Sequence, residues 1–320
     1  MSLSLIGITI GDPFGIGPEI TEKSVLEFLK NKKTKVKIII FGSKKCLNNI
    51  DFPIIDSDRD ITRIEDVAIF DNFPFENGSP GEPSPSGGRL SFIYLEKALQ
   101  FAKSGILNSL ITGPISKTAW EMAGIKYKGH TELLRDYFGV ERVAMTFWSE
   151  DLKVVLFTHH IPLKSLWERL KKEELENFLK FLFNELKRLD LNLEVLVAGL
   201  NPHAGEEGII GEEEEKIIKP VIEKMKIKGF RISGPYPSDS LFHNIKGRKD
   251  AMVLCFYHDQ GLIPFKLIHF KDGIHMTLGL PILRLSPVHG TAFDIAGKGI
   301  ADPSSMLQCL FWLERFSCKF

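Results

Sequence analysis

Short runs of apolar residues recur along the chain, separated by stretches in which apolar positions follow helical spacing. The runs are rich in Val, Ile, Leu and Phe and end at turn or polar residues, which is typical of buried strands. We expect strands at Leu3 to Ile10, 35–42, 106–112, 142–148, 152–158, 194–200 and 251–257. This alternation predicts an α/β protein with mostly parallel sheets flanked by helices.

Apolar positions three and four residues apart predict helices between these strands. The expected helices are Glu19 to Lys30, Arg89 to Lys103, 172–188, 212–228 and Ser304 to Phe316. Pro18 stands just before the first of them, where a missing backbone N–H does no harm. Residues 77–88 (NGSPGEPSPSGG) are too rich in Gly, Pro and Ser for regular structure, so we expect a surface loop, either a connection or a lid.

Charge and composition narrow the class of protein. Lys plus Arg and Asp plus Glu number 41 each, so no excess of positive charge points to a nucleic-acid partner, although a small anion needs only a few local cations. The first residues, MSLSLIGITIGDP, predict a strand and not a signal peptide, and no apolar window reaches the roughly 18 residues of a membrane span. The four cysteines form no C-x-x-C pair. We therefore expect a soluble cytoplasmic protein with reduced thiols.

Three histidines stand just after predicted strands. They are His160, His203 and His258, which follow the runs ending at residues 158, 200 and 257. Because the loops after parallel strands converge at one edge of a sheet, three neutral imidazoles there can bind Zn²⁺ or a similar ion. Asp239 and Asp259 are candidates for further ligands or for partners that orient the imidazoles. The alternative is that each histidine is a hydrogen-bonded structural residue, and spacing alone does not decide between the two.

Several residues suit an anionic ligand. His130 and Thr131 lie in GHTELL (129–134) at a predicted helix N-terminus, where the alternative is a simple helix cap. Lys266 ends YHDQGLIPFK and Arg284 ends GLPILR, and either is equally compatible with an ordinary surface cation. Together with a helix N-terminus, they would form a phosphate clamp in which arginine binds two oxygens.

Two glycine-containing segments have the character of ligand loops. Residues 11–19 (GDPFGIGPE) join a strand to a helix, which suits an anion held by backbone N–H groups. They match neither G-x-G-x-x-G nor G-x-x-x-x-G-K-[ST], so a structural turn remains an alternative. Residues 289–303 (HGTAFDIAGKGIADP) show neither strand nor helix periodicity, and their length favours a ligand loop.

These motifs resemble a known enzyme family. VHGTAFDIAGKGIADP is similar to the nucleotide-binding loop of isopropylmalate and isocitrate dehydrogenases, which bind NAD without a Rossmann glycine fingerprint. The motifs GDPFGIGPEI, ITGPISK, GHTELL, THHIPL, GLNPHAGEEG, GPYPSDSLF and YHDQGLIPFK follow one another as in the 4-hydroxythreonine-4-phosphate dehydrogenase family of pyridoxal phosphate biosynthesis. The likeness runs from about residue 5 to about residue 315.

The resemblance implies a two-domain fold like that of isocitrate and isopropylmalate dehydrogenases. Residues 1–128 with 270–320 are expected to form a nucleotide-binding domain from both chain ends. Residues 129–269 are expected to form a domain for metal, substrate and dimerisation. The family also implies a homodimer whose active site lies at the dimer interface, with ligands from both subunits.

The resemblance assigns roles to individual residues. A divalent ion (Zn²⁺, Mg²⁺ or Co²⁺) is expected on His160, His203 and His258. The expected substrate contacts are His130, Thr131, Lys266, His275 and Arg284. The expected contacts to NAD or NADP are His289, Gly290, Thr291, Ala292 and Asp294. The general base remains open among Lys266, Asp239 and Asp259.

Three positions depart from the family pattern. His275 stands where the family usually has Asn among its substrate contacts. Val288 replaces an Asp beside the nucleotide loop, and Phe14 replaces an Ala in the first turn. The fold and the metal ligands are untouched by these changes, but substrate identity and the affinity for NAD depend on them.

The implied reaction is the NAD-dependent oxidation of the C3 hydroxyl of 4-phosphohydroxy-L-threonine. The resulting 3-keto acid loses CO₂ to give 3-amino-2-oxopropyl phosphate. His275 keeps open a sister dehydrogenase acting on a phosphorylated sugar acid such as threonate or erythronate phosphate. The remaining alternatives are a metal hydrolase, since histidines with acidic neighbours also suit metal-bound hydroxide, and a catalytically silent homologue, which Val288 suggests.

Overall fold

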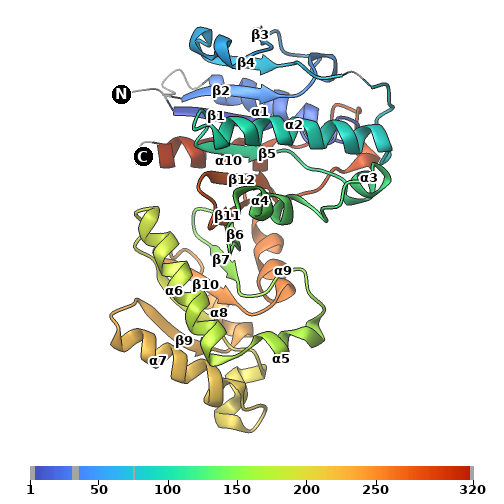
Figure 1. Cartoon of the computed structure of the whole chain (residues 1–320). Helices are drawn as coiled ribbons and strands as arrows, with labels where there is room; N and C mark the ends of the chain where they lie inside the picture. Colours follow the sequence, from blue (N-terminus) through green and yellow to red (C-terminus); the bar gives the residue numbers. More distant parts are fainter. Residues whose placement is uncertain (1–3, 31–35, 75, 318–320) are drawn as a thin grey trace. The chain divides into compact units, whose positions relative to one another are not determined.

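The computed structural model describes residues 4–30, 36–74 and 76–317, and the chain divides into two compact units. Unit 1 contains Met1–Val143 and Ile274–Phe320, and unit 2 contains Ala144–Gly273. The blue and red ends of the chain therefore belong to the same unit (Figure 1).

The sheet of unit 1 has the strand order β3-β4-β2-β1-β5-β12-β11. Its strands are β1 Ser4–Thr9, β2 Val36–Phe41, β3 Ile54–Ile55, β4 Val67–Phe70, β5 Ser109–Thr112, β11 Ile274–Leu278 and β12 Leu283–Pro287. All neighbouring pairs are parallel except β11 and β12, which are antiparallel. Strands β2 and β4 are mostly apolar and buried, and β5 is wholly buried, as expected for a parallel sheet covered by helices.

The helices of unit 1 are α1 Gly17–Leu29, α2 Pro85–Lys103, α3 Lys117–Met122, α4 His130–Phe138 and α10 Ser304–Ser317. Helix α10 packs against α1, where the rings of Phe28 and Phe311 lie 5.4 Å apart, and also contacts β12. Helix α2 contacts β1, β2 and β5 and packs against α3 (Figure 1). The two ends of the chain thus build one core.

The sheet of unit 2 has the order β6-β7-β10-β8-β9. Its strands are β6 Ala144–Trp148, β7 Lys153–Leu156, β8 Glu194–Ala198, β9 Ile232–Tyr236 and β10 Ala251–Cys255. Its helices are α5 Leu166–Arg169, α6 Lys172–Arg188, α7 Lys219–Ile227, α8 Ser238–Asn244 and α9 His258–His269, and a π-helical turn at Glu214–Ile218 precedes α7. Strands β7, β10, β8 and β9 run parallel, so the segments that follow them leave from one edge.

The predicted α/β class and every predicted strand and helix are confirmed, apart from Leu3 and Lys35, which lie outside the described residues. Strands β3, β4, β9, β11 and β12 were not predicted, because they are short or interrupted by Gly, Pro or polar residues. The loop predicted at 77–88 is wrong at its end, since α2 begins at Pro85. Ser84 caps this helix by accepting a hydrogen bond from the Gly87 N–H, and proline is well tolerated in a first turn.

The unit boundaries differ from the expected residues 128/129 and 269/270. Helix α4 belongs to unit 1, where Leu133 and Leu134 are buried and the His130 ring lies 5.9 Å from that of Trp120. Residues 270–273 belong to unit 2, where Asp272 pairs with the His269 imidazole. In the described part of the chain, no helix is both long and apolar enough to cross a membrane.

Candidate active site

Arg284 on β12 is a buried cation surrounded by neutral groups. Its side chain is 2% exposed. The Nε and Nη2 groups both donate to Thr112 Oγ1, at 3.1 and 2.6 Å, and Nη1 donates to Thr277 Oγ1 at 3.0 Å and to His275 Nδ1 at 3.1 Å. Burial lowers the pKa of the guanidinium to about 10. Because a buried charge is costly unless an opposite charge compensates it, this surrounding suits an anionic ligand.

His130, the first residue of α4, lies close enough to Arg284 for the guanidinium charge to affect its imidazole. Burial, and then the positive charge of Arg284, hold the pKa of the imidazole well below its ordinary value, so the ring is neutral. Its Nε2 is shielded from solvent and has no hydrogen-bond partner among the described residues. Thr131 follows in the first turn, and Glu132 accepts a hydrogen bond from the Lys128 N–H at 2.7 Å. The structure therefore brings His130, His275 and Arg284 together in unit 1.

Two loops of unit 1 lie beside the predicted nucleotide-binding segment. The Ile16 N–H donates to the Thr291 carbonyl at 2.9 Å, and a Cβ on Gly15 would lie 2.9 Å from that oxygen. The Gly81 N–H donates to the Phe14 carbonyl at 3.0 Å, so the loop that precedes α2 also lies here. The expected contact residues His289, Gly290, Thr291, Ala292 and Asp294 all retain some exposure to solvent. The segment is thus held at Thr291 while its surface remains accessible.

Two of the departures from the family pattern have a structural account. Phe14 is buried and occupies the space that a side chain on Gly78 would need, with its ring 2.1 Å from the position of such a Cβ. Val288 is also buried, and its N–H donates to Ser305 Oγ at 3.1 Å.

Asp12, in the same turn as Phe14, was not singled out from the sequence. It is wholly buried, and burial raises its carboxyl pKa to about 6.

In unit 2, two of the three predicted metal ligands lie near each other. The rings of His160 and His258 are 5.7 Å apart, and the ring of His159 stacks on His160 at 5.5 Å. Thr158 anchors this segment to the end of β10 through Oγ1, which donates to the Phe256 carbonyl at 2.6 Å. Asp259 Oδ1 lies 2.6 Å from His258 Nδ1. Since a carboxylate accepts, Nδ1 is the donor of this bond, and Nε2 is the nitrogen left to bind a metal ion.

His203 does not join this pair. It lies in a left-handed turn from His203 to Glu207, its side chain is 65% exposed, and its nearest acidic group is Glu206, 3.8 Å away. Among residues 4–30, 36–74 and 76–317, no set of three His, Cys, Asp or Glu side chains is arranged to hold a metal ion. The donor chemistry of His160 and His258 fits a divalent ion, but this single chain brings only two of the three ligands together.

The buried Glu214 and the half-buried Gln260 hold the loops around these histidines. Glu214 accepts hydrogen bonds from the Leu200 N–H (2.8 Å), the Asn201 N–H (2.7 Å) and Asn201 Nδ2 (2.8 Å). Gln260 Nε2 donates to the Gly199 carbonyl at 2.6 Å and to Ser238 Oγ at 2.9 Å. Neither residue was singled out from the sequence. Gln260 follows closely on the end of β10, whereas Glu214 lies in the π-helical turn at Glu214–Ile218, far from a strand end in the sequence.

The three candidates for the general base differ in their surroundings. Asp239 is exposed in the first turn of α8. Asp259 is engaged with His258. Lys266 is half-buried on α9, and burial lowers the pKa of its ammonium group.

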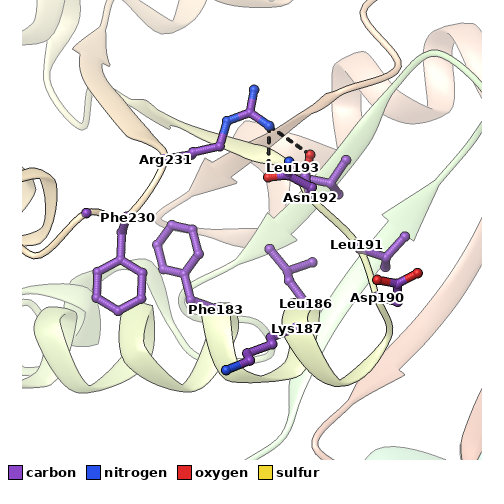
Figure 2. A pocket seen from close by; sticks show the side chains of 10 residues that line it. Phe183, Leu186, Lys187, Asp190, Leu191, Asn192, Leu193, Phe230 and Arg231 are labelled. Atoms are coloured by element: carbon purple, nitrogen blue, oxygen red, sulfur yellow. Dashed lines mark hydrogen bonds between the residues drawn. The ribbon is translucent and has the colours of Figure 1, made fainter.

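A surface pocket of about 360 Å³ in unit 2 involves none of these residues. Figure 2 shows it between the end of α6 and the segment before β9, with the rings of Phe183 and Phe230 stacked 4.7 Å apart. Arg231 at its edge donates to the Asn192 side chain and carbonyl at 2.9 and 3.0 Å. This pocket therefore contains no residue that the motifs single out.

Two relatives align with almost the whole chain. The 4-hydroxythreonine-4-phosphate dehydrogenase of Desulforapulum autotrophicum is 40% identical over 319 residues, which cover 96% of this chain and 93% of that protein. The D-threonate 4-phosphate dehydrogenase of Pectobacterium atrosepticum is 36% identical over 315 residues, with 94% and 96% covered.

Solved structures agree with these relatives. The crystal structure of 4-hydroxythreonine-4-phosphate dehydrogenase from Klebsiella pneumoniae superposes with a TM-score of 0.84 at 33% identity, covering 98% of this chain and 99% of that chain. A β-decarboxylating dehydrogenase from Thermococcus kodakarensis, 16% identical with a TM-score of 0.50 over 98% and 84% of the two chains, shares the fold alone. The predicted isocitrate- and isopropylmalate-dehydrogenase-like fold is thereby confirmed.

The family model described as "Pyridoxal phosphate biosynthetic protein PdxA" matches residues 25–312. This range contains the Arg284 cluster, the three strand-end histidines and the segment from His289 to Asp294. Because both this model and the relatives span most of its length, the chain belongs to the pyridoxal phosphate biosynthetic protein PdxA family.

Proposed function

We propose that this chain is a metal-dependent dehydrogenase that oxidises the C3 hydroxyl of 4-phosphohydroxy-L-threonine with NAD or NADP. The observation that carries the proposal is the buried Arg284 guanidinium, which has only neutral partners in a chain whose relatives are named dehydrogenases of phosphorylated hydroxy acids. A phosphate group supplies the negative charge that this surrounding lacks.

The phosphate is assigned to residues of unit 1. Arg284 provides the charge, and the neutral His130 imidazole is able to donate one N–H from its shielded side. Thr131 adds a hydroxyl at the N-terminus of α4, where the helix dipole favours an anion. His275 and Lys266 complete the proposed substrate contacts. Holding the phosphate in this way would fix the reacting carbon in place.

His160, His203 and His258 would hold the divalent ion, and we propose Zn²⁺, Mg²⁺ or Co²⁺. The pairing of His160 with His258, and the carboxylate on the far side of the His258 ring, support this assignment. When bound, such an ion supplies Lewis acidity that lowers the pKa of a hydroxyl group.

Lys266 is the proposed general base. Its pKa is lowered by burial, so a larger fraction of its amine is neutral and able to accept a proton at physiological pH. Asp259 already pairs with His258, and Asp239 is exposed to solvent. The segment from His289 to Asp294 is assigned to the nicotinamide cofactor, which supplies the hydride acceptor. The 3-keto acid product loses CO₂ to give 3-amino-2-oxopropyl phosphate.

A cytoplasmic homodimer is part of this proposal. Along α9 and just beyond it, Ile263, Leu267 and Phe270 are 65%, 84% and 53% exposed, and their spacing places them on one face of a helix. Contiguous exposed apolar side chains are typical of association surfaces. The free thiols of Cys46, Cys255 and Cys309 fit a reducing compartment. A monomeric mass for the wild-type chain in multi-angle light scattering would contradict the dimer.

The variant Arg284→Met tests the function directly. It removes the cation but keeps an apolar stem of similar length, so kcat/KM for 4-phosphohydroxy-L-threonine should fall about a thousandfold, as when a buried ion pair loses one partner. Steady-state NADH formation with the metal-loaded enzyme measures this. Inorganic phosphate should raise the melting temperature of the wild type but not of the variant. A normal KM in Arg284→Met would place the phosphate elsewhere.

The second candidate substrate is D-threonate 4-phosphate. It is favoured by His275, whose Nδ1 lies 3.1 Å from Arg284 Nη1, and by the name of the Pectobacterium relative. Comparing the two substrates side by side decides between them. If the enzyme turns over only the threonate phosphate, the proposed substrate is wrong but the proposed phosphate site is retained.

A further inference from the structure

The hydrogen bonds of Arg284 determine which part of its guanidinium group faces a ligand. A guanidinium has five N–H groups in a fixed plane. Thr112 Oγ1 accepts two of them, from Nε at 3.1 Å and from Nη2 at 2.6 Å. Both N–H groups of Nη1 are engaged by Thr277 Oγ1 and His275 Nδ1. These four bonds leave one N–H, on Nη2.

We propose that Thr112 is a positioning residue of the phosphate site, which deepens the proposed function and rests on it. By accepting from the Nε–Nη2 edge, the Thr112 hydroxyl fixes the plane of the guanidinium and so directs the remaining N–H of Nη2 toward the anion. The Nε–Nη2 edge, with which arginine binds two oxygens side by side, is then already occupied by Thr112. Arg284 therefore contacts phosphate through Nη2.

The local fold makes Thr112 the fixed partner of this group. Thr112 ends β5, which runs parallel to β12, and the register pairs Leu110 with Arg284 and Ile111 with Leu285. Its side chain is wholly buried, so no water competes for its oxygen. A β-branched side chain in a strand also has few rotamers, so the hydroxyl stays in one place. Thr277 and His275 lie on β11, beside Arg284 on the other side.

Three substitutions separate the hydroxyl from the shape of the side chain. Thr112→Val keeps the volume and removes the acceptor, whereas Thr112→Ser keeps the acceptor. The matched control is Thr9→Val. Thr9 ends the adjacent strand β1 in register with Thr112, is 1% exposed, and its hydroxyl has no hydrogen-bond partner among the described residues.

The first measurement is the Kd of inorganic phosphate by calorimetry, together with kcat and KM on the substrate that the wild type turns over. Thr112→Val should raise both the phosphate Kd and the KM about tenfold with little change in kcat, since a bond to a charged group is lost. For Thr112→Ser and Thr9→Val, the phosphate Kd and the KM should stay within about twofold of the wild-type values. The loss of a hydrogen bond to a charged group is expected to change them by more than that. A folded Thr112→Val that binds phosphate as well as Thr9→Val would overturn the proposal.

Arg284→Met distinguishes this failure from that of the proposed function. If Arg284→Met binds phosphate normally, the phosphate site itself is wrong. If it loses phosphate while Thr112→Val does not, the site stands and only the role of Thr112 is wrong.

The second measurement needs no Thr112 variant to fold. In ¹⁵N NMR of the wild type, the Arg284 Nε–H signal, assigned by its loss in Arg284→Lys, should be protected from exchange without phosphate and move little when phosphate is added. The Nη signals should shift instead. An Nε–H that exchanges freely, or that shifts more than the Nη groups, would overturn the proposal.

Discussion

The two ends of the same three strands in unit 2 carry opposite kinds of chemistry. At their amino ends, β7, β8 and β10 begin at or next to charged residues, namely Lys153, Glu194 and Asp250. Beyond their carboxyl ends follow His160, His203 and His258. At the amino ends, Arg248 forms ion pairs with Glu194 and Asp250, whereas beyond the carboxyl ends the pairs are those of His258 with Asp259 and of His203 with Glu206 at 3.8 Å.

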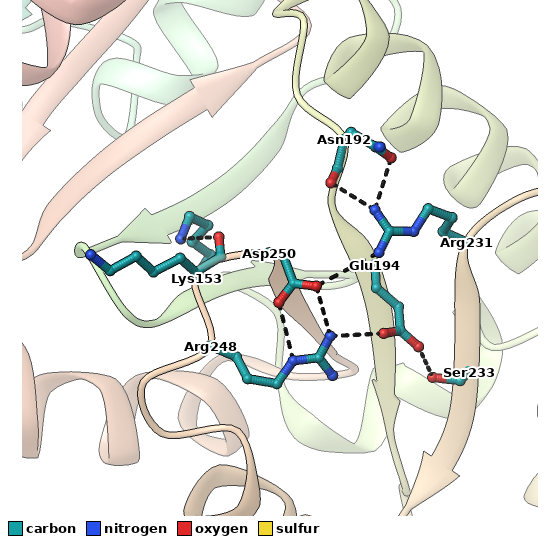
Figure 3. A network of polar contacts seen from close by, with 8 residues as sticks. Lys153, Asn192, Glu194, Arg231, Ser233, Arg248 and Asp250 are labelled. Carbon is teal, nitrogen blue, oxygen red and sulfur yellow. Dashed lines mark hydrogen bonds and ion pairs between the residues drawn. The ribbon is translucent and has the colours of Figure 1, made fainter.

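Figure 3 shows the amino-end network. Arg248 Nη2 binds Glu194 at 3.0 Å and Asp250 at 3.0 Å, and its Nε binds Asp250 at 3.2 Å. Ser233 donates to the second oxygen of Glu194 at 2.7 Å. Lys153 donates to the Lys249 carbonyl at 3.0 Å. Polar groups that satisfy one another stabilise the fold, whereas donors and lone pairs left over at a strand edge are available to a ligand.

The largest effect on metal binding and turnover should come from a substitution beyond the carboxyl ends of these three strands. His203→Asn should abolish Co²⁺ binding and turnover, because it removes a proposed ligand. Asn tolerates the left-handed backbone at His203 (φ 53°), so the fold should be unaffected. Titration with Co²⁺, followed by its visible absorption, measures binding. Unchanged absorption and turnover would show that His203 is not a ligand.

A smaller effect on metal affinity is expected from Glu214, which accepts hydrogen bonds from the loop that carries His203. Glu214→Gln turns one of three acceptor contacts into a clash between two NH₂ groups, so the loop that carries His203 should lose its position. Co²⁺ affinity should fall roughly tenfold, as for other groups that orient metal ligands. The control is Glu213→Gln, because the hydrogen bond of the Glu213 carboxylate within the described part of the chain is the one from the Asn201 side chain, at 2.7 Å. Equal affinities for the two variants would remove Glu214 from the site.

At the amino end, Arg248→Met should alter stability and leave activity intact. The network is partly exposed, so solvent screening limits the loss in the free energy of unfolding to about 1 kcal/mol. Urea unfolding measures this loss, and NADH formation checks the activity. A large loss of turnover would mean that the two ends are coupled.

The smallest effect is a dependence of stability on pH. The Ser233 hydroxyl and then Arg248 lower the pKa of Glu194, and Arg248 lowers the pKa of Asp250. The stabilisation is therefore complete above the ordinary pKa values of 4.5 and 3.8 and is lost as pH falls through the lowered ones. Acid unfolding of Arg248→Met should show a weaker dependence in this range. An identical profile would mean that these carboxylates do not contribute.

Local pattern was enough to predict most elements. Each buried strand is a run of branched and aromatic side chains, and the turn that follows it is marked by Gly, Pro or a polar residue. The same pattern predicted that the three histidines follow the ends of strands, and they follow β7, β8 and β10. It missed β9, β11 and β12, because polar residues, glycine or proline break their apolar runs.

By itself, the sequence determined the α/β class, the order of the motifs and the residue types available for binding, since these depend on neighbours within a few positions. Only the tertiary structure decided that Arg284 is buried among neutral hydroxyls, because its partner Thr112 lies 172 positions away. The same holds for the pairing of His160 with His258 and for the exposed, left-handed position of His203. Burial and hydrogen-bond partners arise from contacts between distant segments, which no local periodicity encodes.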